Sequence, residues 1–336
     1  MRSQVVGIDI GSVALSLVLM DKQGVVLHTS YQFHQGQIRE TLQAMLSHLD
    51  CRRVGAVAAT LSGPDIFSLI SRYDTQISMI AAVRHFYQKV GSILFVGGEN
   101  FGLITFNDEG DYERYRSNTS CAAGTGSFLD QQAVRLNLKS IDLLSSVAFC
   151  NQDSAPKIAT RCAVFAKTDL IHAQQEGYSV GQISDGLCEG LAKNVVDTLM
   201  PDQEARTPLV LAGGVSMNQA VVKHFCNLLH VEPLIGEHSH LYGAIGAALL
   251  RMEEGMPEDF RLERWDELFN DEIHEKTYAY PPLCLKESIY PDFTSCEKYL
   301  YEPRNKFPAI EVDLYAPLQS VEEVRSEEHT SELQSQ

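Results

Sequence analysis

The sequence lacks any dense block of lysine and arginine, and its formal net charge is -17 at pH 7. Nucleic acids and anionic membranes are bound through clustered basic surfaces, so neither is expected as the main partner. Also missing is an apolar run long enough to cross a bilayer, since Asp9 already interrupts the first short one. With 336 residues and 44% hydrophobic content, the chain is expected to be a soluble globular enzyme with one two-lobed domain or two small ones.

Cysteine is sparse and scattered, without Cys-x-x-Cys pairs and without the density of a disulfide scaffold. The eight cysteines are Cys51, Cys121, Cys150, Cys162, Cys188, Cys226, Cys284 and Cys296. This usage predicts a reducing, cytoplasmic location. The eleven histidines form no His-x-x-x-His or His-x-x-Glu pair that would indicate a metal site.

Two stretches of the chain share one pattern of short strands and tight turns. The expected strands are Val5–Ile10, Ala14–Met20 and Val25–Thr29 in the first, and Ile93–Val96, Phe101–Asn107 and Tyr112–Tyr115 in the second. The spacing from Gly11 to Gly24 equals that from Gly97 to Gly110, thirteen residues in both. The repeated pattern predicts a duplicated α/β unit whose two halves face one another.

Four glycine-rich turns are candidate nucleotide loops: Gly11-Ser12, Gly97-Gly98, Gly213-Gly214 and Tyr242-Gly243. Backbone N–H groups in such turns approach phosphate oxygens closely because no Cβ intervenes. Asp9 stands beside the first turn, where a carboxylate can position hydrated Mg²⁺. Between the turns, apolar residues recur at three- and four-residue steps from Val180 to Leu199, which predicts one long amphipathic helix.

Five stretches resemble the ATPase activators of 2-hydroxyacyl-CoA dehydratases and benzoyl-CoA reductases, within the actin, Hsp70 and sugar-kinase superfamily. They are Gly7–Ser12, Cys121–Asp130, Cys162–Ala166, Gly213–Val215 with Asn218, and Tyr242–Ala244. The resemblance covers residues 5 to about 252. It implies an α/β, duplicated ribonuclease H-like (actin-like ATPase) fold, with two lobes around a nucleotide cleft.

The resemblance also implies an activity: ATP-driven transfer of a low-potential electron from a 4Fe-4S cluster to a dehydratase or CoA-ester reductase. The cluster is shared by a homodimer, Mg²⁺ accompanies ATP, and reduced ferredoxin or flavodoxin is the expected electron donor. Asp9 and Glu99 are the expected catalytic residues, and Cys121 and Cys162 the cluster ligands. The expected nucleotide-binding residues are Gly11, Ser12, Gly97, Gly98, Ala123, Gly124, Gly126, Gly213, Gly214, Val215, Asn218 and Gly243.

The sequence departs from the family pattern at both phosphate turns. Val13 and Ser16 replace the usual threonine and lysine, and Phe95 and Asn100 replace two aspartates of the second turn. Glu99 remains as a group that could orient water or metal. Slow or absent hydrolysis is therefore left open.

Cys121 and Cys162 each precede a run that reads as a helix, Ala122–Leu136 and Ala163–Gln174. A helix N-terminus carries roughly half a positive charge, which favours a thiolate and an anionic cluster. A cluster held by cysteine alone needs four thiolates, so two subunits are expected to contribute two each. The other cysteines of the first 250 residues are expected to be core or surface thiols.

Two other readings of the same fold stay open. One is a small-molecule kinase without a cluster, and the other is a nucleotide-binding scaffold that does not hydrolyse ATP. Both would keep the glycine turns.

Composition and resemblance suggest domain boundaries. The predicted parts are a first ATPase lobe (1–90), a second lobe with cluster-binding helices and adenosine loops (91–255), an extended linker towards a missing downstream domain (256–324), and a foreign tail (325–336). Glu311–Leu318 resembles the link that precedes a second ATPase domain in long family members. The tail reads as the translation of a sequencing-library adapter, the alternative being a genuine charged tail.

Overall fold

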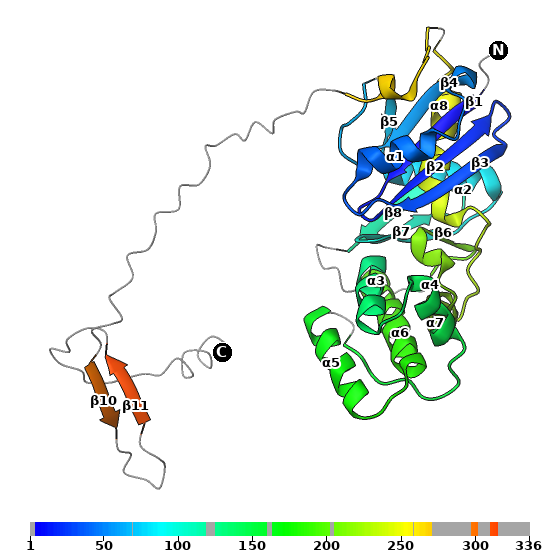
Figure 1. Ribbon diagram of the computed structural model, residues 1–336. Helices are drawn as coiled ribbons and strands as arrows, with labels where there is room; N and C mark the ends of the chain where they lie inside the picture. The colour runs from blue at the N-terminus through cyan, green and yellow to red at the C-terminus, as the bar shows by residue number, and fades with distance from the viewer. Residues whose placement is uncertain are drawn as a thin grey trace. The chain divides into compact units, whose positions relative to one another are not determined.

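The computed structural model describes residues 4–68, 70–118, 125–159, 163–201, 205–257 and 259–270, and two further strands. The chain divides into two compact units, Met1–Ile273 and His274–Gln336. The first unit contains both copies of the predicted duplicated pattern (Figure 1).

The first sheet has five strands in the order β3-β2-β1-β4-β5. The strands are β1 (Gln4–Ile10), β2 (Ala14–Asp21), β3 (Val26–Phe33), β4 (Val54–Thr60) and β5 (Ser71–Tyr73). The first three form an antiparallel meander, and β4 pairs parallel to β1. We call this sheet, with the elements that pack on it, the first lobe.

The second sheet repeats this topology in the order β8-β7-β6-β9. Its strands are β6 (Ser92–Val96), β7 (Phe101–Phe106), β8 (Tyr112–Ser117) and β9 (Leu209–Ala212). Again three strands form an antiparallel meander, and β9 pairs parallel to β6. The predicted duplication is therefore confirmed, and this sheet with its helices is the second lobe.

Two helices, α2 (Thr75–Phe86) and α8 (Tyr242–Glu253), contribute to one buried core with side chains from both sheets. Met79 of α2 and Ile245 of α8 share this core with Val5 of β1 and Ile93 of β6. Helix α8 comes late in the chain but packs closely on β1: a Cβ added at Gly7 would lie only 2.0 Å from the carbonyl oxygen of Ala244. The two lobes are thus joined by a common layer.

The remaining helices share buried clusters with the other faces of the two sheets. Helix α1 (Ile38–Leu46) packs on the first sheet. The second lobe holds α3 (Gly126–Arg135), α4 (Ile141–Phe149), α5 (Ala163–Gln175), α6 (Val180–Leu199) and α7 (Gln219–Leu229). Helix α6 has the predicted bounds, with Ser179 and Gln182 forming a capping box at its start. Short 3-10 turns are Cys51–Arg53, Gly214–Met217, Ser239–Leu241 and Trp265–Leu268.

The chain after α8 returns to the first lobe. Leu262, Leu268 and Phe269 are buried against α1 and the first sheet, and the indole Nε1 of Trp265 donates to the carbonyl of Leu49 at 2.9 Å. This packed segment falls within the predicted linker that starts at residue 256. Apolar residues at irregular spacing, rather than a helical period, form these contacts.

The second unit contains an antiparallel pair of strands, β10 (Glu297–Tyr301) and β11 (Ile310–Leu314). Among the described residues, no helix combines the length and apolar character needed to span a bilayer.

Candidate functional site

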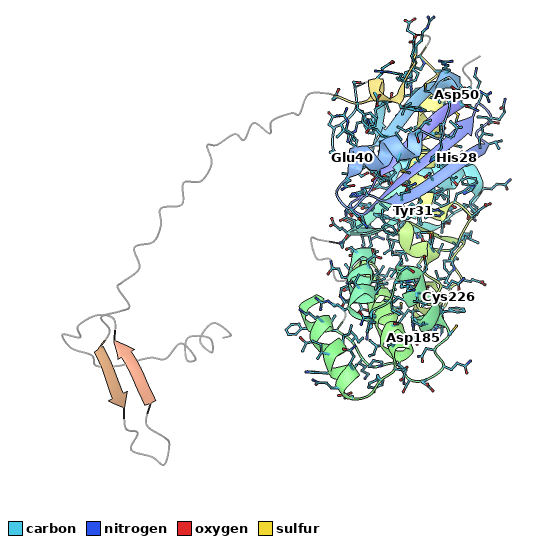
Figure 2. All side chains as sticks on the ribbon, in the orientation of Figure 1. His28, Tyr31, Glu40, Asp50, Asp185 and Cys226 are labelled. Carbon is cyan, nitrogen blue, oxygen red and sulfur yellow. The ribbon has the colours of Figure 1, made fainter. Side chains whose placement is uncertain are left out.

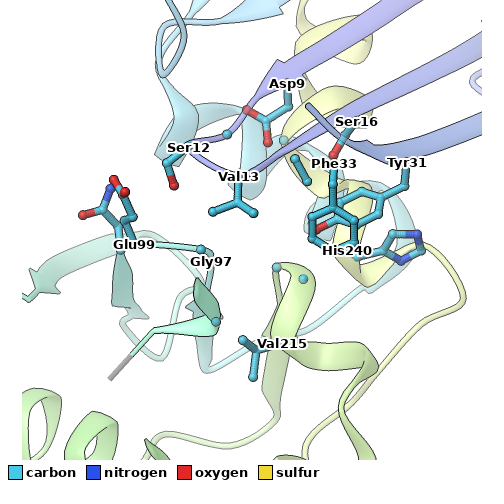
Figure 3. Close-up of a pocket in the computed structure, with 18 of the residues that line it drawn as sticks. Asp9, Ser12, Val13, Ser16, Tyr31, Phe33, Gly97, Glu99, Val215 and His240 are labelled. Atoms are coloured by element: carbon cyan, nitrogen blue, oxygen red, sulfur yellow. The ribbon is translucent and has the colours of Figure 1, made fainter. Parts of the chain in front are cut away.

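A cavity of about 450 Å³ is lined by residues of both lobes (Figure 3). Twelve of the residues predicted from the sequence to serve the site line it: Asp9, Gly11, Ser12, Gly97, Gly98, Glu99, Gly126, Gly213, Gly214, Val215, Asn218 and Gly243. The other four, Cys121, Ala123, Gly124 and Cys162, lie outside the described residues. The structure therefore gathers residues separated by more than two hundred positions around one space.

Asp9 lies one residue before the end of β1, on the face that looks towards α8, because alternate residues of a strand point to opposite faces. Its Oδ1 accepts hydrogen bonds from Thr60 Oγ1 at 2.5 Å and Ser62 Oγ at 3.0 Å. Burial raises the pKa of the Asp9 carboxyl, while the two hydroxyls act in the opposite direction. Its Oδ2 lies beside Gly243, where an added Cβ would approach to 2.6 Å. Oδ2 accepts no hydrogen bond from the described residues, so it is free for a hydrated cation.

The two glycine turns have the same geometry. Gly11 N–H donates to the Ala14 carbonyl at 3.0 Å, and Gly97 N–H donates to the Asn100 carbonyl at 2.8 Å. The next amides, those of Ser12 and Gly98, donate to no described group and are available to a ligand. The turns also touch, since a Cβ at Gly98 would lie 2.6 Å from Cγ2 of Val13.

Because the two turns are equivalent, the residues at matching positions can be compared, and one pair differs in chemistry. Asp9 precedes Gly11 by two residues, and Phe95 precedes Gly97 by two, so an aromatic ring replaces the second carboxylate. This ring stacks on Tyr115 with a centroid distance of 6.3 Å. Glu99 lies at the tip of the second turn and is exposed. Only one carboxylate is therefore placed at the symmetric position behind the turns.

Each glycine turn is braced by the residue that follows the third strand of its meander. After β3, Nδ1 of His34 accepts from Gly36 N–H at 3.0 Å, so Nε2 carries the proton and donates to the Gly11 carbonyl at 3.2 Å. After β8, Asn118 accepts from Phe101 N–H at 2.9 Å and donates to the Glu99 carbonyl at 3.2 Å. The sequence analysis missed both residues, because nothing in their local sequence indicates the distant turn.

Helix α3 begins at Gly126, later than the start predicted at Ala122. Thr125 is extended, and the N–H groups of Gly126 and Ser127 each donate at 2.9 Å to the carbonyls of Gly97 and Gly98. The carbonyl groups of the second glycine turn thus accept hydrogen bonds from the first two amides of the helix. Helix α5 begins at Ala163, as predicted.

The opposite wall of the cavity contains the turn after β9. Asn218 caps α7 by accepting from the amides of Ala220 and Val221, both at 3.1 Å. Tyr31 of β3 reaches this wall, and its ring meets that of His240 edge to face at 5.3 Å. Tyr31, Phe33 and His240 lie close together in Figure 3.

The charge of the cavity is acidic. Asp9, Glu99, Asp130 and Asp142 line it, and no lysine or arginine does so among the described residues. Burial and the carboxylate of Asp142 raise the pKa of Asp130. A polyphosphate would need accompanying cations and neutral donors to bind here.

The described cysteines have no arrangement for metal binding. Cys51 and Cys188 are buried, Cys150 is exposed and Cys226 is intermediate, which agrees with their predicted character as core or surface thiols. Burial raises the pKa of the Cys188 thiol, which keeps it protonated. Within the described part of the chain, no three His, Cys, Asp or Glu side chains converge on one point.

A duplicated strand meander whose two glycine turns face one cavity defines the class of actin-like, two-lobed ATPase folds. The chain belongs to the BadF/BadG/BcrA/BcrD ATPase family, which matches residues 6–250.

The chain is also similar to proteins named as activators of acyl-CoA dehydratases. The activator of lactoyl-CoA dehydratase from Anaerotignum propionicum is 28% identical over 253 residues, covering 74% of this chain and 96% of the relative. The (R)-2-hydroxyglutaryl-CoA dehydratase activating ATPase from Acidaminococcus fermentans is 26% identical over 250 residues, covering 72% and 95%. The structure of the 2-hydroxyisocaproyl-CoA dehydratase activator from Clostridium difficile with bound ADPNP has a TM-score of 0.67 at 22% identity, covering 75% of this chain and 95% of that chain.

Proposed function

We propose that this protein is an ATP-dependent activator that delivers a low-potential electron to a 2-hydroxyacyl-CoA dehydratase or a related CoA-ester reductase. The observation that carries the proposal is the set of twelve predicted site residues around one cavity, in a chain that belongs to this ATPase family. The names of its relatives as dehydratase activators support the same role.

In this proposal the cavity binds ATP with Mg²⁺. The amides of Ser12 and Gly98 donate to phosphate oxygens from the two facing turns. Asp9 would hold the hydrated cation, while Thr60 and Ser62 keep its carboxylate oriented through Oδ1. The turn from Gly213 to Asn218 and the start of α8 at Gly243 form the adenosine side.

Hydrolysis then requires a group that positions water at the terminal phosphate. Glu99 is the candidate because it lines the cavity from the second turn and is exposed enough to reach solvent. Phe95 offers no help, since its ring packs on Tyr115. A chain that binds ATP but does not turn it over would be the non-hydrolysing scaffold.

We propose Cys121 and Cys162 as ligands of a 4Fe-4S cluster that bridges two copies of the chain. When bound, such a cluster supplies a one-electron redox centre of low potential. Cys162 immediately precedes α5. On the other side, Asn118 and Gly126 flank residues 119–124 and both hydrogen-bond to the second glycine turn. If nucleotide binding shifts this turn, it would therefore also displace Asn118 and Gly126, the residues on either side of the segment that contains Cys121.

Activation of a dehydratase tests the proposal. Anaerobically purified protein is mixed with Mg-ATP, reduced ferredoxin or flavodoxin, and a 2-hydroxyacyl-CoA dehydratase, and formation of the enoyl-CoA product is followed. We expect product only when ATP and the electron donor are both present. ATP turnover without activation of any dehydratase or reductase would favour the kinase reading, and phosphorylation of a small-molecule acceptor would establish it.

A further inference from the structure

Arg72 of β5 binds the loop 61–65, which follows β4 and forms part of the cavity wall. Its Nη2 donates to the carbonyl oxygen of Gly63 at 2.5 Å, and the carbonyl oxygen of Leu61 lies 3.5 Å from the same nitrogen. One guanidinium nitrogen therefore contacts the backbone carbonyls on both sides of Ser62.

The other nitrogens of this guanidinium have no contact outside the loop. Nη1 pairs with the carboxylate of Asp65 at 3.2 Å, whereas Nε is buried and has no partner among the described residues. Only 18% of the Arg72 side chain is exposed. Arg53 of the same lobe, in contrast, pairs at the surface with Asp50, which is labelled in Figure 2. Because a buried donor without an acceptor lowers stability, the loop contacts are what account for the burial of Arg72.

The loop carries Ser62, whose hydroxyl donates to Oδ1 of Asp9 at 3.0 Å. The other donor to this oxygen, Thr60, is buried at the end of β4, so the strand fixes its position. Ser62 has no such support, since it is exposed and its amide and that of Gly63 donate to no described group. The place of the Ser62 hydroxyl therefore depends on what holds the neighbouring carbonyls.

We propose that Arg72 is a positioning residue for the Mg-ATP site, which keeps the Ser62 hydroxyl on the Asp9 carboxylate by binding the loop carbonyls beside Ser62. This assignment rests on the proposed nucleotide-binding function. Arg72 itself does not line the cavity, so it acts through the loop. A hydrogen bond to the charged form of a carboxylate stabilises that form, and the charged form is the one that binds Mg²⁺.

The experiment measures ATP affinity by isothermal titration calorimetry, once with Mg²⁺ and once with EDTA. It compares wild-type protein, Arg72→Met, Ser62→Ala and the double variant. We expect each single variant to bind Mg-ATP about fivefold more weakly, because the hydroxyl is lost from the Asp9 carboxylate. Affinity in EDTA should change by less than about twofold, since no cation then links the nucleotide to Asp9. The double variant should again lose about fivefold, because the two residues act through one hydrogen bond.

Arg251→Met is the matched control. The Arg251 side chain is 13% exposed, pairs with Glu254 and does not line the cavity, so this variant should bind Mg-ATP as the wild-type protein does. Arg72→Lys serves if Arg72→Met does not fold. It keeps the charge but lacks the planar fork of the guanidinium, and it should show the same loss with Mg²⁺ and none in EDTA.

Equal losses with Mg²⁺ and with EDTA would assign Arg72 to packing of the loop alone and overturn the proposal. Losses that multiply to about 25-fold in the double variant would overturn it as well, because Arg72 would then act independently of Ser62. Unchanged affinities in the Arg72 variants would do the same, while leaving the nucleotide site intact. Failure of the wild-type protein to bind any nucleotide would remove both this proposal and the activator function.

Discussion

The carboxyl group of Asp9 illustrates a conflict between stability and function at a single residue. Burial raises its pKa in the folded protein above the value in the unfolded chain. Folding then favours the protonated form, so this contribution to stability is fully present below the unfolded pKa and is lost as the pH rises through the folded pKa. Above the unfolded pKa, folding must either bury the Asp9 charge or take up a proton, and a bound cation would offset that cost.

Asp9→Asn is expected to lower ATP hydrolysis by about 10- to 100-fold, with a smaller effect on ATP affinity, because the group that orients the cation is lost. The same change should raise the free energy of unfolding of nucleotide-free protein at pH 7, since asparagine has no charge that folding must bury or neutralise. Steady-state turnover and thermal unfolding with and without Mg-ATP measure the two effects.

Asp108→Asn, in an exposed turn, is the control and should alter neither quantity. Wild-type turnover in Asp9→Asn would show that the cation is positioned elsewhere. A lower unfolding temperature for the nucleotide-free variant would contradict the argument from burial.

At the scale of elements, the sequence predicted those features whose cause is local. Both meanders, the tight turns and helix α6 were found within a few residues of their observed bounds, because alternation, glycine turns and helical periodicity are properties of short stretches. The start of α3 was misplaced, since the amides of Gly126 and Ser127 bind carbonyls almost thirty residues away.

The site was predicted in the same uneven way. The glycines and Asp9 stand in recognisable motifs. Tyr31, His34 and Asn118, in contrast, contact residues that are distant in the sequence and are brought near only by the folded sheets. No spacing in the sequence relates Tyr31 to Gly214, because the two lobes must first pack against α2 and α8. Residues of this kind become visible only from the structure.

His34 and Asn118 allow a test of whether their hydrogen bonds hold the two glycine turns in shape for nucleotide binding. His34→Ala and Asn118→Ala are each expected to weaken Mg-ATP binding about fivefold, because each turn loses a hydrogen bond of roughly 1 kcal/mol that fixes its amides. Calorimetric titration with Mg-ATP measures the affinities of the two variants and the double variant.

Asn151→Ala provides the comparison, since Asn151 binds Asp185 within the second lobe and does not line the cavity. If removal of either brace leaves Mg-ATP affinity at the wild-type value, the turns hold their shape without these side chains. Their contacts would then have no role in the site.

At the scale of the whole molecule, the two lobes share one buried core, which limits how they can move relative to one another. Helices α2 and α8 share buried side chains with both sheets, and a Cβ at Gly246 of α8 would lie only 1.7 Å from the carbonyl oxygen of Ser78 in α2. Such close packing favours motion of the two lobes about this layer over motion within it. A nucleotide that contacts both glycine turns would therefore favour one arrangement of the two lobes about this shared core.

The dimer-bridging cluster is the prediction that concerns the assembled protein. Anaerobically prepared protein is expected to be a brown dimer with about one 4Fe-4S cluster for two chains, because four cysteine ligands require two from each copy. Cys121→Ala and Cys162→Ala should each remove the visible absorption and weaken the dimer, as measured by iron content and analytical ultracentrifugation. Cys150→Ala, which changes an exposed thiol, should retain colour and assembly.

Protein that binds Mg-ATP and dimerises fully but carries no iron after anaerobic reconstitution would rule out this electron-transfer role. A monomer with a complete cluster would instead locate further ligands among the other cysteines, since two thiolates from one chain leave half of the cluster's iron sites without a cysteine.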